Sequence, residues 1–308
     1  MTARARIVCA TDLRVRSNFA LNRAVQLARQ TGARLTLVHA VDARRSAPRV
    51  RAQVNRAYVQ LLSMVDRTFG SAAAATDIVV RAGGPLDVIV KVATEVDADL
   101  VVLAAPQRRR LDSIFGTTAE RLLRAMQRPV LVVHRRTTFS YRRVSMAVDL
   151  SNASLPMIQA AARLGMLERA ETTLLHATAP PLEGMLKTVG VEEQAIDDYK
   201  QGWQDDARAR LQAMLTAAEM DIERTRILVR TEPPAAAIQR VIEEERPDLL
   251  TIGASRWFLI KRLLIGSVAD RVLRTAMCDV LVIPQRIVPR RAAGPVDPPD
   301  AKTHTLMC

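Results

Sequence analysis

Residues 6–12 read RIVCATD, and residues 143–149 read RVSMAVD. Each stretch is a short apolar run that ends in a carboxylate, and such runs are typical of buried β-strands. The two stretches lie about 140 residues apart, which is the length of a domain and far more than the roughly 20 to 50 residues of a solenoid repeat. The chain is therefore predicted to be a tandem duplication, and its function should be sought in a site that one or both copies retain.

The correspondence continues along both halves. In each half the next apolar run ends in a histidine, His39 or His176, at the same offset from the opening aspartate. Further on, FGTTAERLL at 115–123 corresponds to IGSVADRVL at 265–273. This agreement in order and spacing indicates that the two copies share one architecture.

Each half alternates short Val/Ile/Leu runs with longer amphipathic stretches. Strands are predicted at 6–11, 35–40, 77–81, 99–104 and 129–134, and again at 143–148, 172–177, 226–230, 248–253 and 279–283. Helices are predicted at 17–31, 49–69, 85–96 and 117–126, and again at 153–165, 190–220, 234–245 and 267–276. Apolar strands alternating with helices favour parallel sheets that are covered on both faces. We therefore predict the α/β class, with two tandem open parallel five-stranded sheets flanked by helices.

The expected boundaries follow from these elements. The first domain spans 1–136, a linker spans 137–142, and the second domain spans 143–285. The remaining stretch, 286–308, is rich in proline, alanine and charged residues, and we expect it to be a disordered tail.

Composition limits the class of protein. The chain has 308 residues and is 49% hydrophobic, but it has no apolar run near the roughly 18 residues that a membrane span requires, and no signal sequence is recognised. Its cysteines are Cys9, Cys278 and Cys308, an odd number without metal-ligand spacing. We expect the first two to be buried structural residues and the protein to be cytoplasmic.

The net charge of +13 comes from arginines scattered along the chain. Such a charge favours anionic partners in general but specifies none. Only 3% of the residues are aromatic, so the stacking surfaces of single-strand binders are nearly absent, and no zinc-finger or RNP pattern occurs. Nucleic acid is therefore not favoured as a partner, and a basic solvated surface is the simpler explanation.

Three recurring features fall where ligands bind in an open parallel sheet, beyond the carboxyl ends of the strands. They are an aspartate after the first strand, a His-Ala pair at the end of the second, and a glycine followed by a hydroxyl residue at the start of a helix. The last feature suits phosphate, because free amides and the helix dipole attract an anion. The residues are Asp12 and Asp149, His39-Ala40 and His176-Ala177, and Gly116-Thr117 and Gly266-Ser267.

Each feature also has an ordinary structural explanation. A hydroxyl residue at a helix start can be an N-cap, and an aspartate after a strand can shape a turn. The histidines can pack at a strand edge, and no nucleophile elbow accompanies them, so we assign no catalytic residue. The joint recurrence of the features in both halves is what favours a site.

These motifs together resemble the universal stress protein family. Its domains open with a strand ending in Asp and a second strand ending in His plus a hydrophobic residue, as here. The family's fourth strand is matched at 99–102 and 248–250, and its Gly-x-Pro turn at 84–85 and 233–234. The resemblance spans nearly all of residues 4–284. It implies a Rossmann-like, adenine-nucleotide α-hydrolase-like fold and a phosphate loop of the form G-2x-G-9x-G-S/T.

The phosphate loop departs from the family pattern in both halves. In the second half Gly253 and Gly266-Ser267 keep the spacing, but Arg256 stands at the middle glycine. In the first half both early glycines are missing, and Gly116-Thr117 remains. Glycines in such loops allow close approach to phosphate, so their loss should alter or abolish ATP binding.

The resemblance implies a degenerate ATP-type site in the second domain, in which Asp149 contacts the base or ribose and Gly266 and Ser267 hold phosphates, with Mg²⁺ if a triphosphate binds. The first domain is expected to have a vestigial site. The second-domain site comprises Asp149, Ala177, Gly253, Arg256, Gly266 and Ser267, and the vestigial one comprises Asp12, Ala40, Gly116 and Thr117.

The function predicted from the sequence is a cytoplasmic universal stress protein that acts by binding an adenine nucleotide, another small anionic ligand, or protein partners. One alternative is a slow ATP hydrolase or nucleotide-dependent switch, although the chain has no Walker lysine and no evident general base. A second alternative is a basic nucleic-acid-associated protein. The resemblance implies that the closing strands at 129–133 and 280–283 face each other, which would make the chain an intra-chain pseudo-dimer. A homodimer of two chains is a further alternative.

Overall fold

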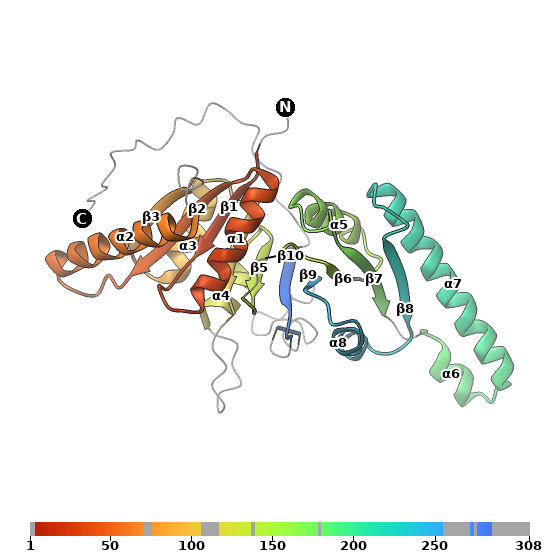
Figure 1. The fold of residues 1–308 in the computed structure, drawn as a ribbon. Helices are drawn as coiled ribbons and strands as arrows, with labels where there is room; N and C mark the ends of the chain where they lie inside the picture. Colours follow the sequence, from red (N-terminus) through yellow and green to blue (C-terminus); the bar gives the residue numbers. More distant parts are fainter. Residues whose placement is uncertain are drawn as a thin grey trace. The chain divides into compact units, whose positions relative to one another are not determined.

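The computed structural model describes residues 4–69, 76–105, 117–136, 139–177, 180–254, 272–273 and 276–284. The chain divides into two compact units, with the boundary between residues 138 and 139. Each unit contains a five-stranded parallel sheet with helices packed on it (Figure 1). The α/β class predicted from the sequence is therefore confirmed.

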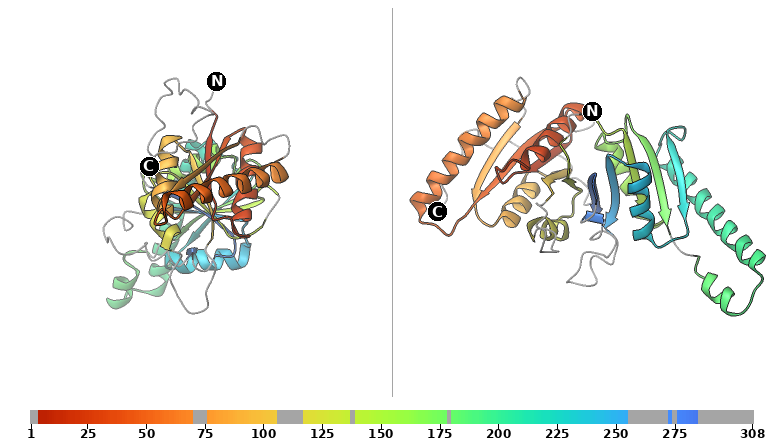
Figure 2. Two further views of the ribbon diagram at one scale, coloured as in Figure 1. Left: turned by 90° about the vertical axis from the view of Figure 1, so that its left-hand side faces the viewer. Right: turned by 60° about the horizontal axis from the view of Figure 1, so that its bottom comes forward.

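Unit 1 begins with its central strand and adds strands on either side. Its strands lie in the order β3-β2-β1-β4-β5, with all neighbouring pairs parallel. The chain moves outward from β1 to β3 and then returns to β4, so the topological switch point lies between β1 and β4. Helices α1 and α2 cover one face of the sheet, and α3 and α4 cover the other (Figures 1 and 2). The elements are β1 (Arg6–Ala10), α1 (Ser17–Thr31), β2 (Arg34–Val41), α2 (Ala47–Phe69), β3 (Thr76–Ala82), α3 (Pro85–Glu95), β4 (Leu100–Ala104), α4 (Thr117–Ala125) and β5 (Val130–Val133).

Unit 2 repeats this topology. Its strands lie in the order β10-β9-β6-β7-β8, again all parallel, and the switch point lies between β6 and β9. Helix α7 packs on β8, α8 on β6 and β7, and α5 on β9. The elements are β6 (Arg143–Val148), α5 (Ser154–Arg163), β7 (Glu171–Ala177), α6 (Glu183–Thr188), α7 (Glu193–Ala217), β8 (Thr225–Arg230), α8 (Pro234–Glu245), β9 (Leu249–Ala254) and β10 (Asp279–Pro284).

The strands form because their apolar runs are buried on both faces. Leu37 and Val101 in unit 1, and Met146 and Leu174 in unit 2, are fully buried. Burial of each such side chain contributes about 1.5–3 kcal/mol relative to leaving it in water. The continuous apolar pattern thus reflects cover by helices above and below each sheet.

The helix predicted at 190–220 is found as α7, Glu193–Ala217, and the short helix α6 before it was not among the predicted helices. Gly190 has a φ of +72°, a left-handed conformation that ends the preceding helix. The helix expected at 267–276 and the tail at 286–308 lie almost entirely outside the described residues. Within the described ranges, no helix is long and apolar enough to span a membrane.

Two buried residues anchor the start of unit 2. Tyr141 lies in the stretch expected to be the linker, and it is only 3% exposed. Its hydroxyl donates a hydrogen bond to Oδ2 of Asp279, 2.9 Å away, and Asp279 is buried at the start of β10. The chain entering β6 is therefore tied to the core of unit 2.

The two described cysteines behave as the sequence predicted. Cys9 and Cys278 are both buried thiols. Burial raises the pKa of the Cys9 thiol to about 12, so this thiol stays protonated at neutral pH. A buried neutral thiol acts as a small apolar side chain.

Candidate functional site

Three predicted site residues of unit 2 come together at the carboxyl edge of its sheet. Val148 of β6 is paired with His176 of β7, and Ala147 of β6 is paired with Ile252 of β9. The next residues along these three strands are Asp149, Ala177 and Gly253. They therefore lie beside the switch point, where ligands bind in open α/β sheets. Arg256, Gly266 and Ser267 lie outside the described residues.

Unit 1 places its counterparts in the same way. Asp12 follows β1, and Ala40 lies near the end of the neighbouring strand β2. Thr117 is the first residue of α4, and Gly116 lies outside the described residues. The structure thus brings Asp12 and Ala40 to one edge but does not describe the loop that would complete the site.

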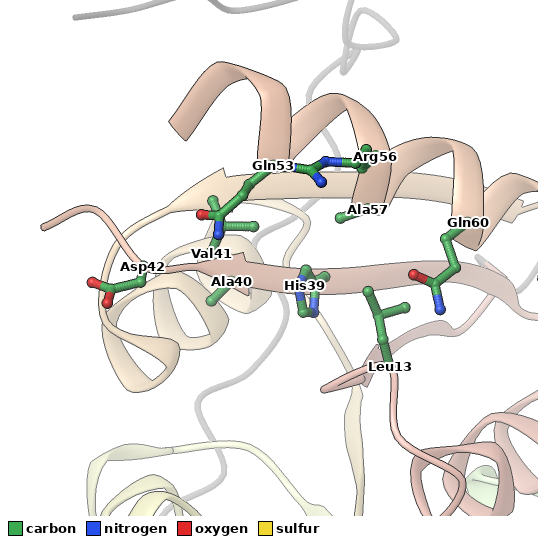
Figure 3. A pocket seen from close by; sticks show the side chains of 9 residues that line it. All are labelled: Leu13, His39, Ala40, Val41, Asp42, Gln53, Arg56, Ala57 and Gln60. Atoms are coloured by element: carbon green, nitrogen blue, oxygen red, sulfur yellow. The ribbon is translucent and has the colours of Figure 1, made fainter. Parts of the chain in front are cut away.

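A cavity of 350 Å³ lies at the carboxyl end of β2, between that strand and α2 (Figure 3). It is next to the loop that follows β1. The sequence predicted His39 and Ala40 as features of a ligand edge, but it predicted none of the residues that α2 contributes to this cavity. Its lining residues are Leu13, His39, Ala40, Val41, Asp42, Gln53, Arg56, Ala57 and Gln60.

Asp149 is fixed in place by the residues that follow it. Its Oδ1 accepts a hydrogen bond from the Ser151 amide at 3.0 Å and another from the Ser154 hydroxyl at 3.0 Å. Ser154 is buried as the first residue of α5. The first turn of the helix therefore orients the carboxylate at the end of the strand.

Asp149 is ionised at neutral pH. Partial desolvation acts to raise its pKa, but hydrogen bonds from Ser151 and Ser154 outweigh that effect, and its pKa lies below the ordinary value. A carboxylate in this state can only accept hydrogen bonds. The edge of unit 2 therefore presents a fixed anionic acceptor.

We expect Ser154→Ala to raise the pKa of Asp149 toward its ordinary value, because one of the bonds to the ionised form is lost. In the wild type the folded pKa is below the unfolded value of about 3.9, so this carboxylate stabilises the fold above that pH. The contribution is lost as the pH falls through the folded pKa. NMR titration of the Asp149 carboxyl carbon measures the shift. Ser17→Ala, the matched change in unit 1, should leave it unmoved, and an unmoved pKa in Ser154→Ala would contradict the assigned hydrogen bond.

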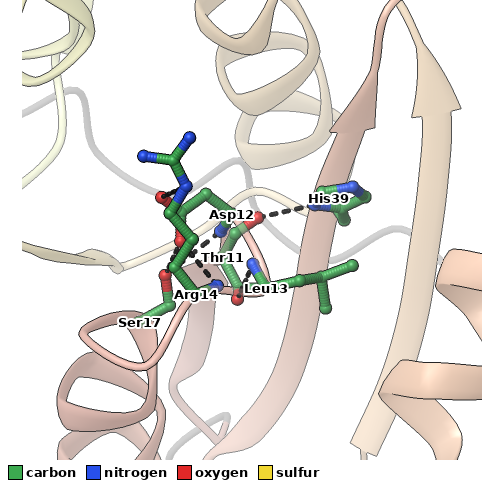
Figure 4. Close-up of polar contacts among 6 residues, drawn as sticks. All are labelled: Thr11, Asp12, Leu13, Arg14, Ser17 and His39. Carbon is green, nitrogen blue, oxygen red and sulfur yellow. Dashed lines mark hydrogen bonds and ion pairs between the residues drawn. The ribbon is translucent and has the colours of Figure 1, made fainter.

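The equivalent loop of unit 1 has the same design (Figure 4). Asp12 Oδ1 accepts hydrogen bonds from the Arg14 amide at 3.0 Å and from the Ser17 hydroxyl. The Arg14 guanidinium also lies 3.8 Å from Asp12 Oδ2. Because both groups of this ion pair are well exposed, it adds little stability. Arg14 therefore lies beside the carboxylate of unit 1, and Ser151 occupies the matching position in unit 2.

The residue after each aspartate has an unusual backbone conformation. Leu13 has a φ of 63° and Leu150 a φ of 57°. A left-handed conformation costs a leucine about 1–2 kcal/mol, which glycine would avoid. Strained residues of this kind persist where the surrounding structure holds them, and they cluster at ligand sites. The recurrence in both units marks this loop as part of the site.

The two histidines hold the ends of neighbouring strands together. His39 Nδ1 lies 2.8 Å from the Thr11 carbonyl, and His176 Nδ1 lies 2.9 Å from the Val148 carbonyl (Figure 4 shows His39). A carbonyl only accepts, so Nδ1 carries the hydrogen in each ring, and in the neutral ring Nε2 is left as an acceptor. Both histidines thus fix the geometry of the edge on which the aspartates sit.

Packing leaves room for a methyl group at Gly253. A Cβ added there would meet Met157 Sδ at 3.6 Å, an ordinary contact distance. The backbone of Gly253 is not in the left-handed region either. Glycine is therefore not required at this position by the fold of the described residues.

The fold defines a duplicated α/β protein of the doubly wound type, with a topological switch point in each unit. The sequence profile described as "Universal stress protein family" matches residues 4–134 and 140–284. The chain therefore belongs to the universal stress protein family, which confirms the resemblance drawn from its motifs.

Individual proteins and solved structures are similar to all or part of the chain. The chain is 27% identical over 150 residues to the universal stress protein YxiE of Bacillus subtilis, covering 46% of this chain and 99% of that protein. The crystal structure of a universal stress protein from Archaeoglobus fulgidus shares the fold at a TM-score of 0.68, with 15% identity, over 91% of this chain and 98% of its own. A universal stress protein solved in complex with cAMP is 26% identical and covers 43% of this chain and 99% of its own, at a TM-score of 0.37.

Proposed function

We propose that this protein acts by binding, and that the carboxyl edge of unit 2 holds an adenine nucleotide or another small anionic ligand. The observation that carries the proposal is the fixed, ionised Asp149 at the switch point, level with Ala177 and one residue beyond the level of Gly253. Ligands of α/β sheets bind at this point. Membership of the universal stress protein family supports the same choice of ligand.

The roles of the residues follow from their chemistry. Asp149 accepts hydrogen bonds from ribose hydroxyls or from the amino group of the base, because it is an acceptor only. Ala177 is small, and Gly253 has no side chain, so both leave space for the ligand at the edge. Gly266 and Ser267 supply amide and hydroxyl donors to phosphate, and Arg256 pairs with phosphate directly. A bound triphosphate would bring Mg²⁺ with it.

Unit 1 is proposed to be vestigial for this ligand. Asp12 keeps the position and the serine partner of Asp149, but Arg14 lies beside its carboxylate. The sequence after β4 lacks both early glycines of the family's phosphate loop. A nucleotide would therefore meet fewer donors in unit 1 than in unit 2.

We expect Gly253→Ala to weaken Mg-ATP binding about tenfold or more while leaving the fold intact. The methyl group fits against Met157 in the protein but fills the space that the ligand would approach. Gly202→Ala in α7 is the control, since a Cβ there meets nothing within 4 Å. Calorimetric titration measures the affinity, and thermal unfolding checks the fold. Equal affinity in both variants would contradict the placement of the ligand at Gly253.

Two further results would favour the alternative functions. Release of inorganic phosphate during the Mg-ATP titration would favour the hydrolase. Binding of nucleic acid with a steep salt dependence, measured in a separate experiment, would favour the nucleic-acid-associated protein. We further propose a cytoplasmic location, because the chain has only three cysteines, an odd number without a disulfide-like pattern. The pseudo-dimer through the closing strands stays a prediction.

A further inference from the structure

A second cavity lies at the amino edge of the sheet of unit 2, at the opposite end of the strands from Asp149. Its volume is 570 Å³, within the range of about 300–1,000 Å³ that small-molecule sites occupy. Strand β6 has six residues, so the two edges are about 17 Å apart along it. The cavity is lined by the starts of β6, β7 and β8, by the segments just before β7 and β8, and by the last residue of α8. It is therefore separate from the edge described above.

The floor of this cavity is the face of the sheet that α8 partly covers. Ser145 of β6, Thr173 of β7 and Arg226 of β8 are register partners and form one row across three neighbouring strands (Figure 1). Glu245, at the end of α8, accepts a hydrogen bond from the Thr173 hydroxyl at 3.3 Å and pairs with Arg226 at 2.9 Å. Helix α8 therefore ends over this row.

The next row toward the amino edge is not covered by the helix. Arg143 and Glu171 are register partners two residues before Ser145 and Thr173, so they lie on the same face of the sheet. Both are exposed. An arginine and a glutamate thus stand side by side at the open end of the cavity.

Four charged side chains of the lining make no ion pair or hydrogen bond with the described residues. They are Arg143, Arg169, Glu171 and Glu223. The other three charged lining residues are engaged, because Arg226 pairs with Glu245 and Arg224 Nε lies 3.6 Å from Asp221 Oδ2. Two cations and two anions therefore remain available to a ligand.

Unit 1 uses the equivalent positions internally. Arg34, the first residue of β2, pairs with Asp77 at 2.8 Å. Arg6, the first residue of β1, donates through Nη1 to the Val96 carbonyl at 2.9 Å. The counterparts in unit 2, which are the first residues of β7 and β6, have no such partners among the described residues. Unit 2 has therefore freed the charges at this edge.

Ser145 adds a buried polar group to the floor. It lines the cavity and is 2% exposed, and its hydroxyl makes no hydrogen bond with the described residues. The unpartnered hydroxyl of Thr251, by contrast, is sealed inside the sheet. The third residue of the matching strand in unit 1 is Val8, which is fully buried. A buried hydroxyl without a partner is costly, so a ligand that bonds to Ser145 is favoured.

We propose that this cavity binds a free α-amino acid. The carboxylate of the ligand pairs with the free guanidinium groups, its ammonium pairs with the free carboxylates, and the Ser145 hydroxyl can bond to either end. A purely anionic ligand would face two unpaired glutamates, and a purely cationic one would face two unpaired arginines. A dipolar ligand matches both signs at once.

The test uses the full-length protein with L-leucine, L-glutamate and L-lysine as probes, titrated and observed by saturation-transfer NMR. We expect at least one of them to bind, and we expect acetate and methylammonium, which each carry one of the two charges, to bind at least about tenfold more weakly.

Variants locate the binding. Arg143→Gln and Glu171→Gln each remove one charge at an exposed strand start, and each should weaken binding about tenfold with the thermal unfolding midpoint unchanged. Ser145→Val introduces the residue that unit 1 buries at this position, and it should also weaken binding. Glu168→Gln is the control, since Glu168 is exposed, precedes Arg169 and does not line the cavity. It should change nothing.

Three results would overturn the amino-acid site. These are no binding of any of the three probes, binding that both charge variants leave unchanged, and acetate binding as tight as that of the amino acids, which would indicate a simple anion site. The inference does not rest on the nucleotide proposal. Mg-ATP binding should be unchanged in Arg143→Gln, so the failure of one proposal can be told from the failure of the other.

Discussion

Replacing Asp149 with alanine is expected to weaken Mg-ATP binding by about 10- to 150-fold. A hydrogen bond to a charged group is worth about 1.5–3 kcal/mol, and each 1.4 kcal/mol corresponds to a factor of ten in affinity. The variant removes the one fixed anionic acceptor that we describe at the edge of unit 2. Calorimetric titration of wild type and variant under identical salt measures the change.

Two control variants test whether the loss of affinity is specific to the Asp149 carboxylate. Asp12→Ala removes the equivalent carboxylate of unit 1 and should leave Mg-ATP binding unchanged. Asp149→Asn keeps the size of the side chain and one acceptor oxygen, so its loss of affinity should be smaller. If Asp12→Ala reduced binding and Asp149→Ala did not, the ligand would belong to unit 1.

Leu174→Ala is expected to destabilise unit 2 by about 2–5 kcal/mol. Leu174 lies in the middle of β7 and is 0% exposed, so its truncation removes buried apolar surface and leaves a cavity between sheet and helix. Leu182→Ala is the matched control, because Leu182 is 45% exposed, and its effect should stay within about 0.5 kcal/mol.

Denaturant unfolding followed by tryptophan fluorescence measures this effect in the right unit. Both tryptophans of the chain, Trp203 and Trp257, lie in the second half. A signal from unit 2 alone avoids treating a two-domain protein as a single two-state system. Equal unfolding midpoints for the two leucine variants would contradict the assignment of Leu174 to the core.

The strands could be predicted from sequence because each is a continuous apolar run between polar residues. Strand β6 was expected at 143–148 and is found at Arg143–Val148, and β2 was expected at 35–40 and is found at Arg34–Val41. The positions of Asp12 and Asp149, each at the carboxyl edge of the sheet in its own unit, could be predicted as well. Parallel strands present their carboxyl ends at the same edge of a sheet.

The finer parts of the site could not be predicted. Nothing in a leucine signals the left-handed backbone of Leu13 and Leu150, because that conformation is imposed by the loop around it. The hydrogen bond from Arg210 to the Leu150 carbonyl depends on how α7 lies against the loop after β6, which a single sequence does not contain.

A calorimetric titration of the wild-type protein with Mg-ATP tests the central claim most directly. We predict saturable binding with one site per chain and no release of inorganic phosphate, because unit 2 alone is proposed to keep a working edge and the sequence shows no evident general base. Absence of binding, two equal sites per chain, or turnover of the nucleotide would contradict the account.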